Sequence, residues 1–133
     1  MKRLGHCLLA IKVKVSALII NLYSLIFNPQ PSVSFDHDAF IAEVYDIVRQ
    51  IPAGRVLSYG RIAELAGWPN HSRAVGRAMK DAPLALGLPC HRVVNSVGRT
   101  VPGWHEQAIL LMSEGVRIKE NGCVDMQRFT WEL

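Results

Sequence analysis

Two short helical segments separated by a tight turn constrain the fold of this chain more than any other feature of its sequence. Ser58 can cap a helix over Tyr59–Ala66, which Gly67 would end. After four intervening residues, Ser72 can cap another short helix over Arg73–Lys80. Two short helices with such a turn between them predict a helix-turn-helix.

The segment Arg73–Lys80 divides into two faces at helical spacing. Its apolar face holds Val75, Ala78 and Met79, and its opposite face holds Arg73, Gly76, Arg77 and Lys80. A basic face with a glycine in its middle suits nucleic acid, because glycine lets the backbone approach another surface closely. The same pattern is also typical of a solvent-facing basic helix, so this face alone leaves both interpretations open.

The remaining segments predict a mainly α domain with a small β element. Apolar residues at helical spacing predict a helix over Ala39–Gln50, with Asp36 or Asp38 near its start. A further helix is expected over Trp104–Ser113. Its inward face would hold Ala108, Leu111 and Met112. The extended pieces would be Arg55–Leu57, Arg92–Val94 and a small hairpin formed by Val116–Lys119 and the residues after Asn121-Gly122.

The first 34 residues differ in composition from the rest of the chain. They carry four basic residues and no acidic one, and residues 15–27 form a nearly unbroken apolar run. A membrane-spanning helix needs roughly 18 apolar residues or more, and no small-residue cleavage site follows the run. We therefore expect residues 1–34 to be an N-terminal extension, disordered or a mis-assigned start, without stable membrane association. Residues 35–133 would form the one domain.

Positive charge is concentrated between residues 49 and 99. This stretch has eight Arg or Lys residues against two acidic residues, a local charge of +6, whereas the whole chain carries +4. Such a segment favours a polyanionic partner such as DNA. A solvated basic surface is the alternative.

Cys90 is the candidate reactive residue, and it lies in Leu88–Val94, just downstream of the basic helical segment. A thiol is a nucleophile only as thiolate, so a reactive cysteine needs neighbours that lower its pKa. His91 and Arg92 follow it directly. Consecutive residues of an extended segment point to opposite sides, so this adjacency by itself is weak evidence for a dyad.

The chain has three cysteines, Cys7, Cys90 and Cys123, an odd number without CxxC or metal-ligand spacing. This pattern argues against structural zinc and for a reducing compartment. We expect a cytoplasmic protein, associated with the nucleoid in a bacterium.

Four strings in a fixed order resemble the DNA-binding, active-site domain of O6-alkylguanine-DNA alkyltransferases. They are Leu57–Gly60, Ser72–Met79, Leu88–Val94 and Ser113–Val116. The resemblance covers roughly residues 38–133, and the order and spacing of the strings make it far more specific than any one of them. It implies a winged-helix-like helix-turn-helix domain of the alkyltransferase C-terminal type, bound in the minor groove of duplex DNA, and it implies no cofactor and no metal.

The resemblance also implies a role for several residues by their position. Cys90 would accept the alkyl group of a flipped-out O6-alkylguanine, His91 would draw the thiol proton through a water, and Glu114 would orient His91. Tyr59 would assist phosphate rotation and protonate the leaving guanine, and Arg73 would fill the stack in place of the flipped base. DNA contacts are further expected from Gly76, Arg77, Lys80 and Arg92. We expect a monomer.

The chain departs from these alkyltransferases at the position of an asparagine, where it has Ala82, and in the short loop of residues 98–106, which lacks their Gly-Gly-Leu wall. In these respects it resembles alkyltransferase-like proteins, single-domain relatives that hand the lesion to nucleotide excision repair and usually lack the cysteine.

The sequence therefore leaves two main functions open. They are single-turnover transfer to Cys90, which the complete set of nucleophile, base and carboxylate favours, and lesion recognition without reaction. A transcription-factor-like DNA binder is the weaker third. Trp104, in the short loop, is a candidate for lesion contact.

Overall fold

The computed structural model describes residues 34–133, and the prediction of an N-terminal extension falls, apart from Ser34, outside this range. The helices are α2 (His37–Gln50), α3 (Tyr59–Leu65), α4 (Ser72–Lys80), α5 (Glu106–Ser113) and α6 (Met126–Phe129). Two strands, β1 (Leu57–Ser58) and β2 (Val93–Val94), and two 3-10 turns, η1 (Leu84–Leu86) and η2 (Cys90–Arg92), complete the elements. The predicted mainly α fold with a small β element is confirmed. Among these residues no helix combines the length and the apolar character needed to cross a membrane.

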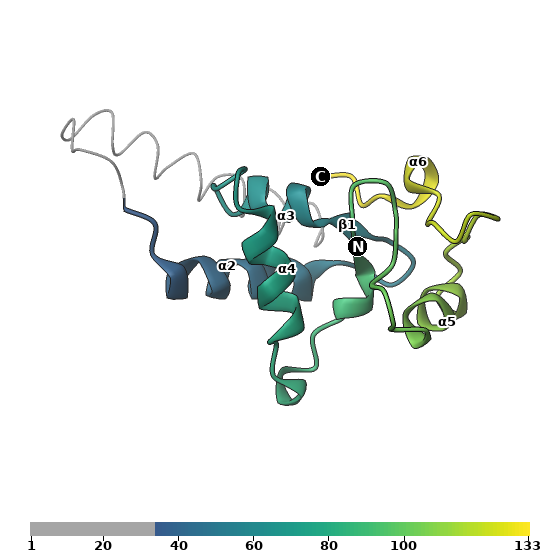
Figure 1. Ribbon diagram of the computed structural model, residues 1–133, viewed down its shortest axis with the longest axis horizontal. Coiled ribbons are helices and arrows are strands. Elements are labelled where there is room, and N and C mark those ends of the chain that lie inside the picture. The colour runs from purple at the N-terminus through teal and green to yellow at the C-terminus, as the bar shows by residue number, and fades with distance from the viewer. Residues whose placement is uncertain (1–33) are drawn as a thin grey trace, which may run out of the picture.

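The helix-turn-helix consists of α3 and α4, which pack against each other and against α2 (Figure 1). Ser58 caps α3 as predicted, because its Oγ accepts a hydrogen bond from the Arg61 N–H at 3.2 Å. The predicted cap of α4 is wrong by one residue. His71 takes the N-cap position, its carbonyl accepting from the Val75 N–H at 3.1 Å, and Ser72 is already helical.

Helix α2 begins two residues earlier than predicted because Asp36 caps it. The Asp36 carboxylate accepts from the backbone N–H groups of Asp38 and Ala39 at 3.1 and 3.2 Å. Its buried face, which holds Phe40, Val44, Ile47 and Val48, packs against α3 and α4. This three-helix core fixes the position of α4 on the surface.

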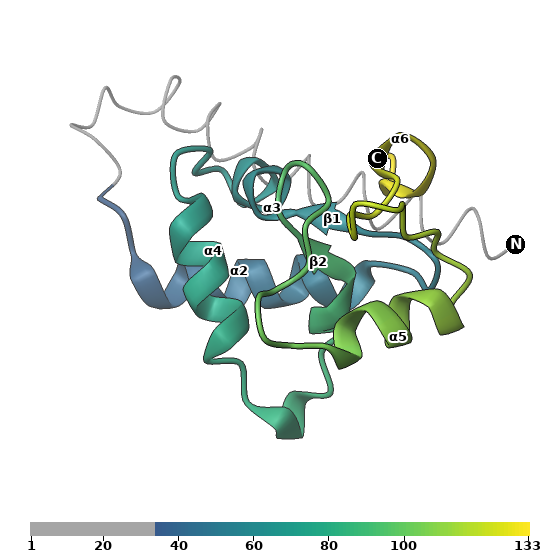
Figure 2. The ribbon, with the colours of Figure 1, turned by 45° about the vertical axis from the view of Figure 1, so that its right-hand side comes forward.

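The two strands pair in parallel and separate two apolar clusters. Leu57 pairs with Val93, and both belong to the large cluster under α2, α3 and α4. Val56 and Val94, whose side chains point to the other side, belong to a smaller cluster with Leu111, Val116 and Val124. Figure 2 shows the result, with α5 and α6 on one side of the strand pair and α3 and α4 on the other.

Helix α5 differs from the prediction in its start and in its inward face. It begins at Glu106, because the preceding residues form a turn closed by the Trp104 N–H and the Val101 carbonyl at 3.2 Å. Leu111 is inward as expected, but Met112 is 53% exposed and Gln107 is fully buried. Gln107 and Leu111 are spaced i, i+4 and define the buried stripe, so Met112, one residue further, is turned away from it.

The segment after α5 forms the predicted small hairpin. Ile118 and Val124 make an antiparallel bridge, and the Lys119 N–H donates to the Cys123 carbonyl at 2.8 Å. The Arg92 backbone, in contrast, belongs to the turn η2, so the predicted strand starts one residue later, at Val93.

Candidate active site and DNA-facing helix

Cys90 and His91 lie in the tight turn η2 that leads into β2. The turn is closed by two backbone hydrogen bonds, from the Cys90 N–H to the Leu88 carbonyl at 2.8 Å and from the Arg92 N–H to the Pro89 carbonyl at 3.0 Å. A 3-10 turn has three residues per turn, so its successive side chains spread around the axis instead of alternating as in a strand. The Cys90 side chain is partly exposed.

Glu114 holds the two residues that follow Cys90. It is the C-cap residue of α5, and Gly115 after it, with φ of +89°, ends the helix as predicted. The Arg92 guanidinium donates to both carboxylate oxygens, with Nε at 3.0 Å from Oε1 and Nη2 in contact with Oε2. The His91 Nε2 lies 3.1 Å from the same Oε2.

Glu114 is a permanently charged anchor at neutral pH. The guanidinium of Arg92 is the main cause that lowers the pKa of this carboxyl to about 2; burial acts in the opposite direction, and His91 lowers the pKa further. The side chains of Glu114 and His91 are each 16% exposed. The His91 Nε2 is buried without an aligned hydrogen-bond partner in the described chain, so its contact with Glu114 is one of proximity and charge.

Arg92, predicted to contact DNA, has its guanidinium inside the protein instead. Its side chain is 17% exposed, and besides the fork to Glu114 its Nη1 donates to the carbonyl of Ile51 at 2.8 Å. Ile51 is the C-cap residue of α2. Arg92 therefore joins the end of α2, the Cys90 turn and the end of α5, and its contact with DNA stays a prediction.

The surroundings of the Cys90 thiol do not lower its pKa. Burial raises the pKa of this thiol, and a hydrogen bond at its own backbone offsets only part of the rise. Within residues 34–133 there is no hydrogen bond between the Cys90 thiol and His91. The expectation that neighbours lower the pKa of Cys90 is therefore not met before DNA binds.

Tyr59 is placed near Cys90 and is kept protonated. Burial is the larger cause that raises the pKa of its hydroxyl, and the negative charge of a Cys90 thiolate is the second. Tyr45, which sequence reasoning missed, responds to the same thiolate, after burial and Asp81. Its hydroxyl donates to the Ala78 carbonyl at 3.1 Å and so joins α2 to the end of α4.

Helix α4 presents the predicted basic face to solvent. Arg73, Arg77 and Lys80 are exposed, whereas Ala74, Val75 and Ala78 are buried. A Cβ atom built on Gly76 would meet no heavy atom within 4 Å. The protein's own packing therefore does not require this glycine, which leaves the middle of the basic face open to an external molecule.

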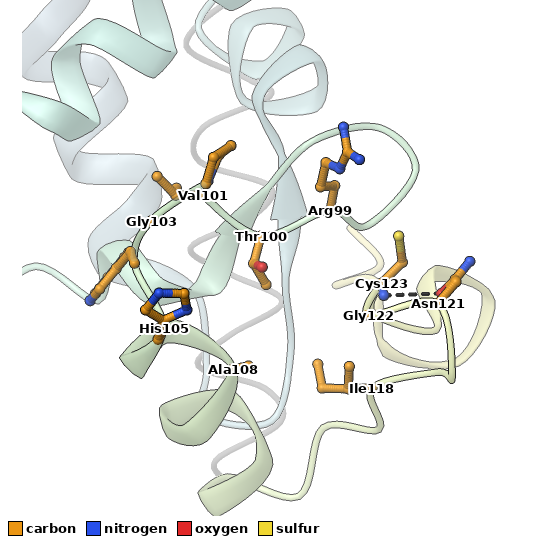
Figure 3. Close-up of a pocket in the computed structure, with 12 residues that line it drawn as sticks. Arg99, Thr100, Val101, Gly103, His105, Ala108, Ile118, Asn121, Gly122 and Cys123 are labelled. Carbon is orange, nitrogen blue, oxygen red and sulfur yellow. Dashed lines mark hydrogen bonds between the residues drawn. The ribbon is translucent and has the colours of Figure 1, made fainter.

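A cavity of about 610 Å³ lies beside the loop that precedes α5 (Figure 3). Its wall is formed by the loop residues Arg99–His105, by Ala108 of α5 and by the hairpin around Cys123. Cys90, His91 and Tyr59 do not line it. Trp104, the candidate for lesion contact, thus stands on the wall of a cavity that is separate from the thiol.

Gln107 connects this loop with the Cys90 turn and was also missed from the sequence. It is 0% exposed, its Oε1 accepts from the Val101 N–H at 2.6 Å, and its Nε2 donates to the His91 and Val93 carbonyls at 3.1 and 3.0 Å. The one sequence signal was its spacing of four residues from Leu111 on the inward face of the helix.

Comparison with known proteins gives consistent relatives. Residues 39–116 match the family model described as the DNA binding domain of 6-O-methylguanine DNA methyltransferase. The DNA base-flipping protein of Escherichia coli (strain K12) is 40% identical over 106 residues, which is 77% of this chain and 82% of that protein. The methylated-DNA–protein-cysteine methyltransferase of Cricetulus griseus is 35% identical over 99 residues, 69% of this chain and 46% of that enzyme.

A solved structure supports the same relationship. Alkyltransferase-like protein 1 of Schizosaccharomyces pombe is 36% identical over 104 residues, 71% of this chain and 96% of that protein. Its crystal structure in complex with damaged DNA containing O6-carboxymethylguanine matches with a TM-score of 0.67 and covers 74% of this chain and all of that one.

Proposed function

Because this chain belongs to the family of 6-O-methylguanine DNA methyltransferase DNA-binding domains, we propose that it binds O6-alkylguanine in duplex DNA, turns the damaged base out of the stack and transfers the alkyl group to Cys90. One observation carries the transfer step. The residue next to Cys90, His91, stands 3.1 Å from a carboxylate that stays ionised at neutral pH. This contact, together with the position of His91 next to Cys90 in the chain, supports a nucleophile, a base and an orienting anion acting together.

Duplex DNA carrying the lesion is the partner that the surface of α4 fits. Arg73, Arg77 and Lys80 are exposed on one face, and Gly76 lets a groove wall approach the backbone. A guanine cannot present its O6 atom to a pocket while it is stacked in the duplex, so the base must be extruded. Arg73, at the start of the helix, would then fill the vacated place in the stack.

The transfer step balances with the residues at hand. The Cys90 thiol gives its proton through a water to His91, whose Nε2 faces Glu114 and whose Nδ1 is the nitrogen left to accept it. The thiolate sulfur forms a bond to the alkyl carbon as the bond from that carbon to O6 breaks. The leaving guanine takes a proton from Tyr59, whose raised pKa keeps it protonated at neutral pH. His91 returns the proton to Tyr59 through solvent, so the thiol proton ends on guanine.

Recognition of the lesion without transfer is the second candidate function, and two observations favour it. Burial raises the pKa of the Cys90 thiol, which lowers the thiolate supply. The chain also spans 82% and 96% of the base-flipping and alkyltransferase-like relatives but 46% of the methyltransferase. In this case the bound lesion would be passed to excision-repair proteins. That partnership, a monomeric state and a cytoplasmic location stay predictions.

Mass spectrometry of the intact protein separates the two functions. After incubation with duplex DNA containing O6-methylguanine, transfer predicts a gain of one methyl group on Cys90 that is absent in Cys90→Ser and retained in Cys123→Ser. Preferential binding of the lesion duplex without a mass gain after prolonged incubation would assign the recognition function. Equal binding of modified and unmodified duplex would refute both.

A further inference from the structure

We infer that Gln107 is a positioning and specificity-determining residue, whose carboxamide sets the position of the loop 95–105 relative to the turn that carries Cys90 and His91. The inference rests on the proposed recognition of O6-alkylguanine and adds to it the side chain that ties the loop bearing Trp104 to the Cys90 turn. Gln107 touches neither the thiol nor the basic face of α4 in the contacts given above.

The side-chain amide of Gln107 acts both as a hydrogen-bond donor and as an acceptor. Two amide hydrogens are donated to the carbonyls of His91 and Val93, and the amide oxygen accepts from the Val101 N–H. The reverse orientation of the amide would place its oxygen against two carbonyls, so the partners themselves fix which end is which. One side chain therefore joins the loop, through Val101, to the chain segment that contains His91 and Val93.

A polar side chain at this depth has a cost that packing alone does not explain. Gln107 is the one buried polar residue of residues 34–133, and its neighbour on the same stripe, Leu111, is apolar. A buried polar group left without a partner is destabilising. An apolar residue of similar size would fill the space without that risk, so the carboxamide points to a positional role.

The far side of the loop offers no comparable support. At one end the loop is fixed, because the Val124 N–H donates to the Gly98 carbonyl at 2.8 Å and a Cβ on Gly98 would lie 2.4 Å from the Val124 oxygen. Beyond Gly98 the loop borders the open cavity, with Val101 and Gly103 on one wall and Ala108 and Ile118 across it (Figure 3). Around Val101 the other hydrogen bonds stay within the loop, between Asn95 and Arg99 and from the Trp104 N–H to the Val101 carbonyl, so loss of Gln107 should loosen the connection of this segment to the Cys90 turn.

The hydrogen bonds of Gln107 lie away from α4, so their loss should affect the preference for modified DNA separately from the affinity for DNA in general. DNA contacts outside the modified base are expected from Arg77 and Lys80, and no hydrogen bond joins Gln107 to α4 in the described part of the chain. The groups that Gln107 holds are the backbone of the Cys90 turn and the loop that bears Trp104. Loss of the tie should therefore change the preference for the modified base and leave the affinity for unmodified duplex unchanged.

Three substitutions of Gln107 break its contacts differently. Gln107→Met removes all of them at similar volume. Gln107→Lys has donors only, so it can keep the two carbonyls but releases Val101, and Gln107→Glu can accept from Val101 but repels both carbonyls until it is protonated. The matched control is Gln127→Met, since Gln127 is an exposed glutamine on α6.

The measurement is the ratio of dissociation constants for unmodified and O6-methylguanine duplexes, by fluorescence anisotropy. We expect this ratio to fall roughly tenfold in Gln107→Met and Gln107→Lys, the equivalent of one lost hydrogen bond, and to stay at the wild-type value in Gln127→Met. In Gln107→Glu the ratio should rise as the pH is lowered, because protonation restores a donor. Wild type measured in parallel is the control for any effect of pH that does not come from position 107.

The outcomes distinguish this inference from the function it rests on. If wild type prefers the lesion duplex and the ratio is unchanged in Gln107→Met and Gln107→Lys, the role of Gln107 is refuted while the proposed function stands. If wild type has no preference, the proposed function is refuted and the inference falls with it. Should Gln107→Met fail to fold, the pH response of Gln107→Glu decides, since it is read within one folded sample, and a response equal to that of wild type refutes the inference.

Discussion

Replacing Glu114 by glutamine should remove a pH-dependent part of the stability of this domain. The Glu114 side chain is 16% exposed, is held by the Arg92 fork and lies 3.1 Å from His91, and these partners lower its pKa from 4.5 to about 2. Because the pKa is lowered in the folded state, the ionised carboxylate stabilises the fold above about pH 4.5. This contribution is lost as the pH falls from 4.5 towards about 2.

The size of the effect follows from the displacement of the pKa. At about 1.4 kcal/mol per pKa unit, a fall from 4.5 to about 2 corresponds to about 3 kcal/mol of unfolding free energy at neutral pH. Glu114→Gln should be destabilised by this order at neutral pH, because it also leaves the Arg92 guanidinium, 17% exposed, without its anion. At about pH 2.5 most of the difference from wild type should have vanished.

Urea unfolding followed by tryptophan fluorescence, to which the buried Trp131 contributes, measures this difference at each pH. Glu64→Gln is the matched control, since Glu64 pairs with Arg61 at 2.8 Å while both side chains are exposed, 52% and 40%. We expect it to cost less than about 1 kcal/mol at either pH. A deficit of Glu114→Gln that is equal at neutral and acid pH would refute the assignment of the stabilisation to the charge of Glu114.

Two further predictions concern DNA binding and the thiol. Arg73→Ala should weaken binding of an O6-methylguanine duplex roughly 10- to 100-fold in anisotropy titrations. The control Arg49→Ala, which removes an exposed arginine of α2, should bind this duplex as tightly as wild type. Equal affinities of Arg73→Ala and wild type would contradict stack insertion. Because burial raises the pKa of Cys90, its alkylation by iodoacetamide without DNA, followed by peptide mass spectrometry, should still accelerate above about pH 8.5, the ordinary cysteine pKa. A rate that levels off below that pH would show that the thiol is already activated.

Local chemistry made much of the helical framework predictable. Ser58 caps α3, Asp36 caps α2 and Gly115 ends α5 because these residues satisfy backbone groups within a few positions of themselves. The two faces of α4 were predictable for the same reason, since helical spacing alone separates Arg73 and Arg77 from the buried side.

Errors arose where a contact between distant segments decided the outcome. Met112 was expected on the inward face of α5, but that face is occupied by Gln107, whose amide reaches the carbonyls of His91 in the Cys90 turn and of Val93 in β2, 16 and 14 residues away in sequence. Periodicity ranks a methionine above a glutamine for burial and contains no information about carbonyls in another segment. The internal partners of Arg92, Glu114 and the Ile51 carbonyl, were missed for the same reason, since they lie 22 and 41 residues away in the sequence.

The sequence by itself determined which segments form α2, α3, α4 and α5 to within about two residues at each start, which face of α4 is basic, and that Cys90 and His91 stand together in the chain. Those features depend on interactions within a few residues, which spacing records. Only the tertiary structure decided that Glu114 holds both His91 and Arg92, 22 residues away in the case of Arg92, and that burial leaves the Cys90 thiol less acidic than an ordinary cysteine. Charge pairing and desolvation depend on which segments the β1–β2 pair and the two apolar clusters bring together, and that is a property of the folded chain.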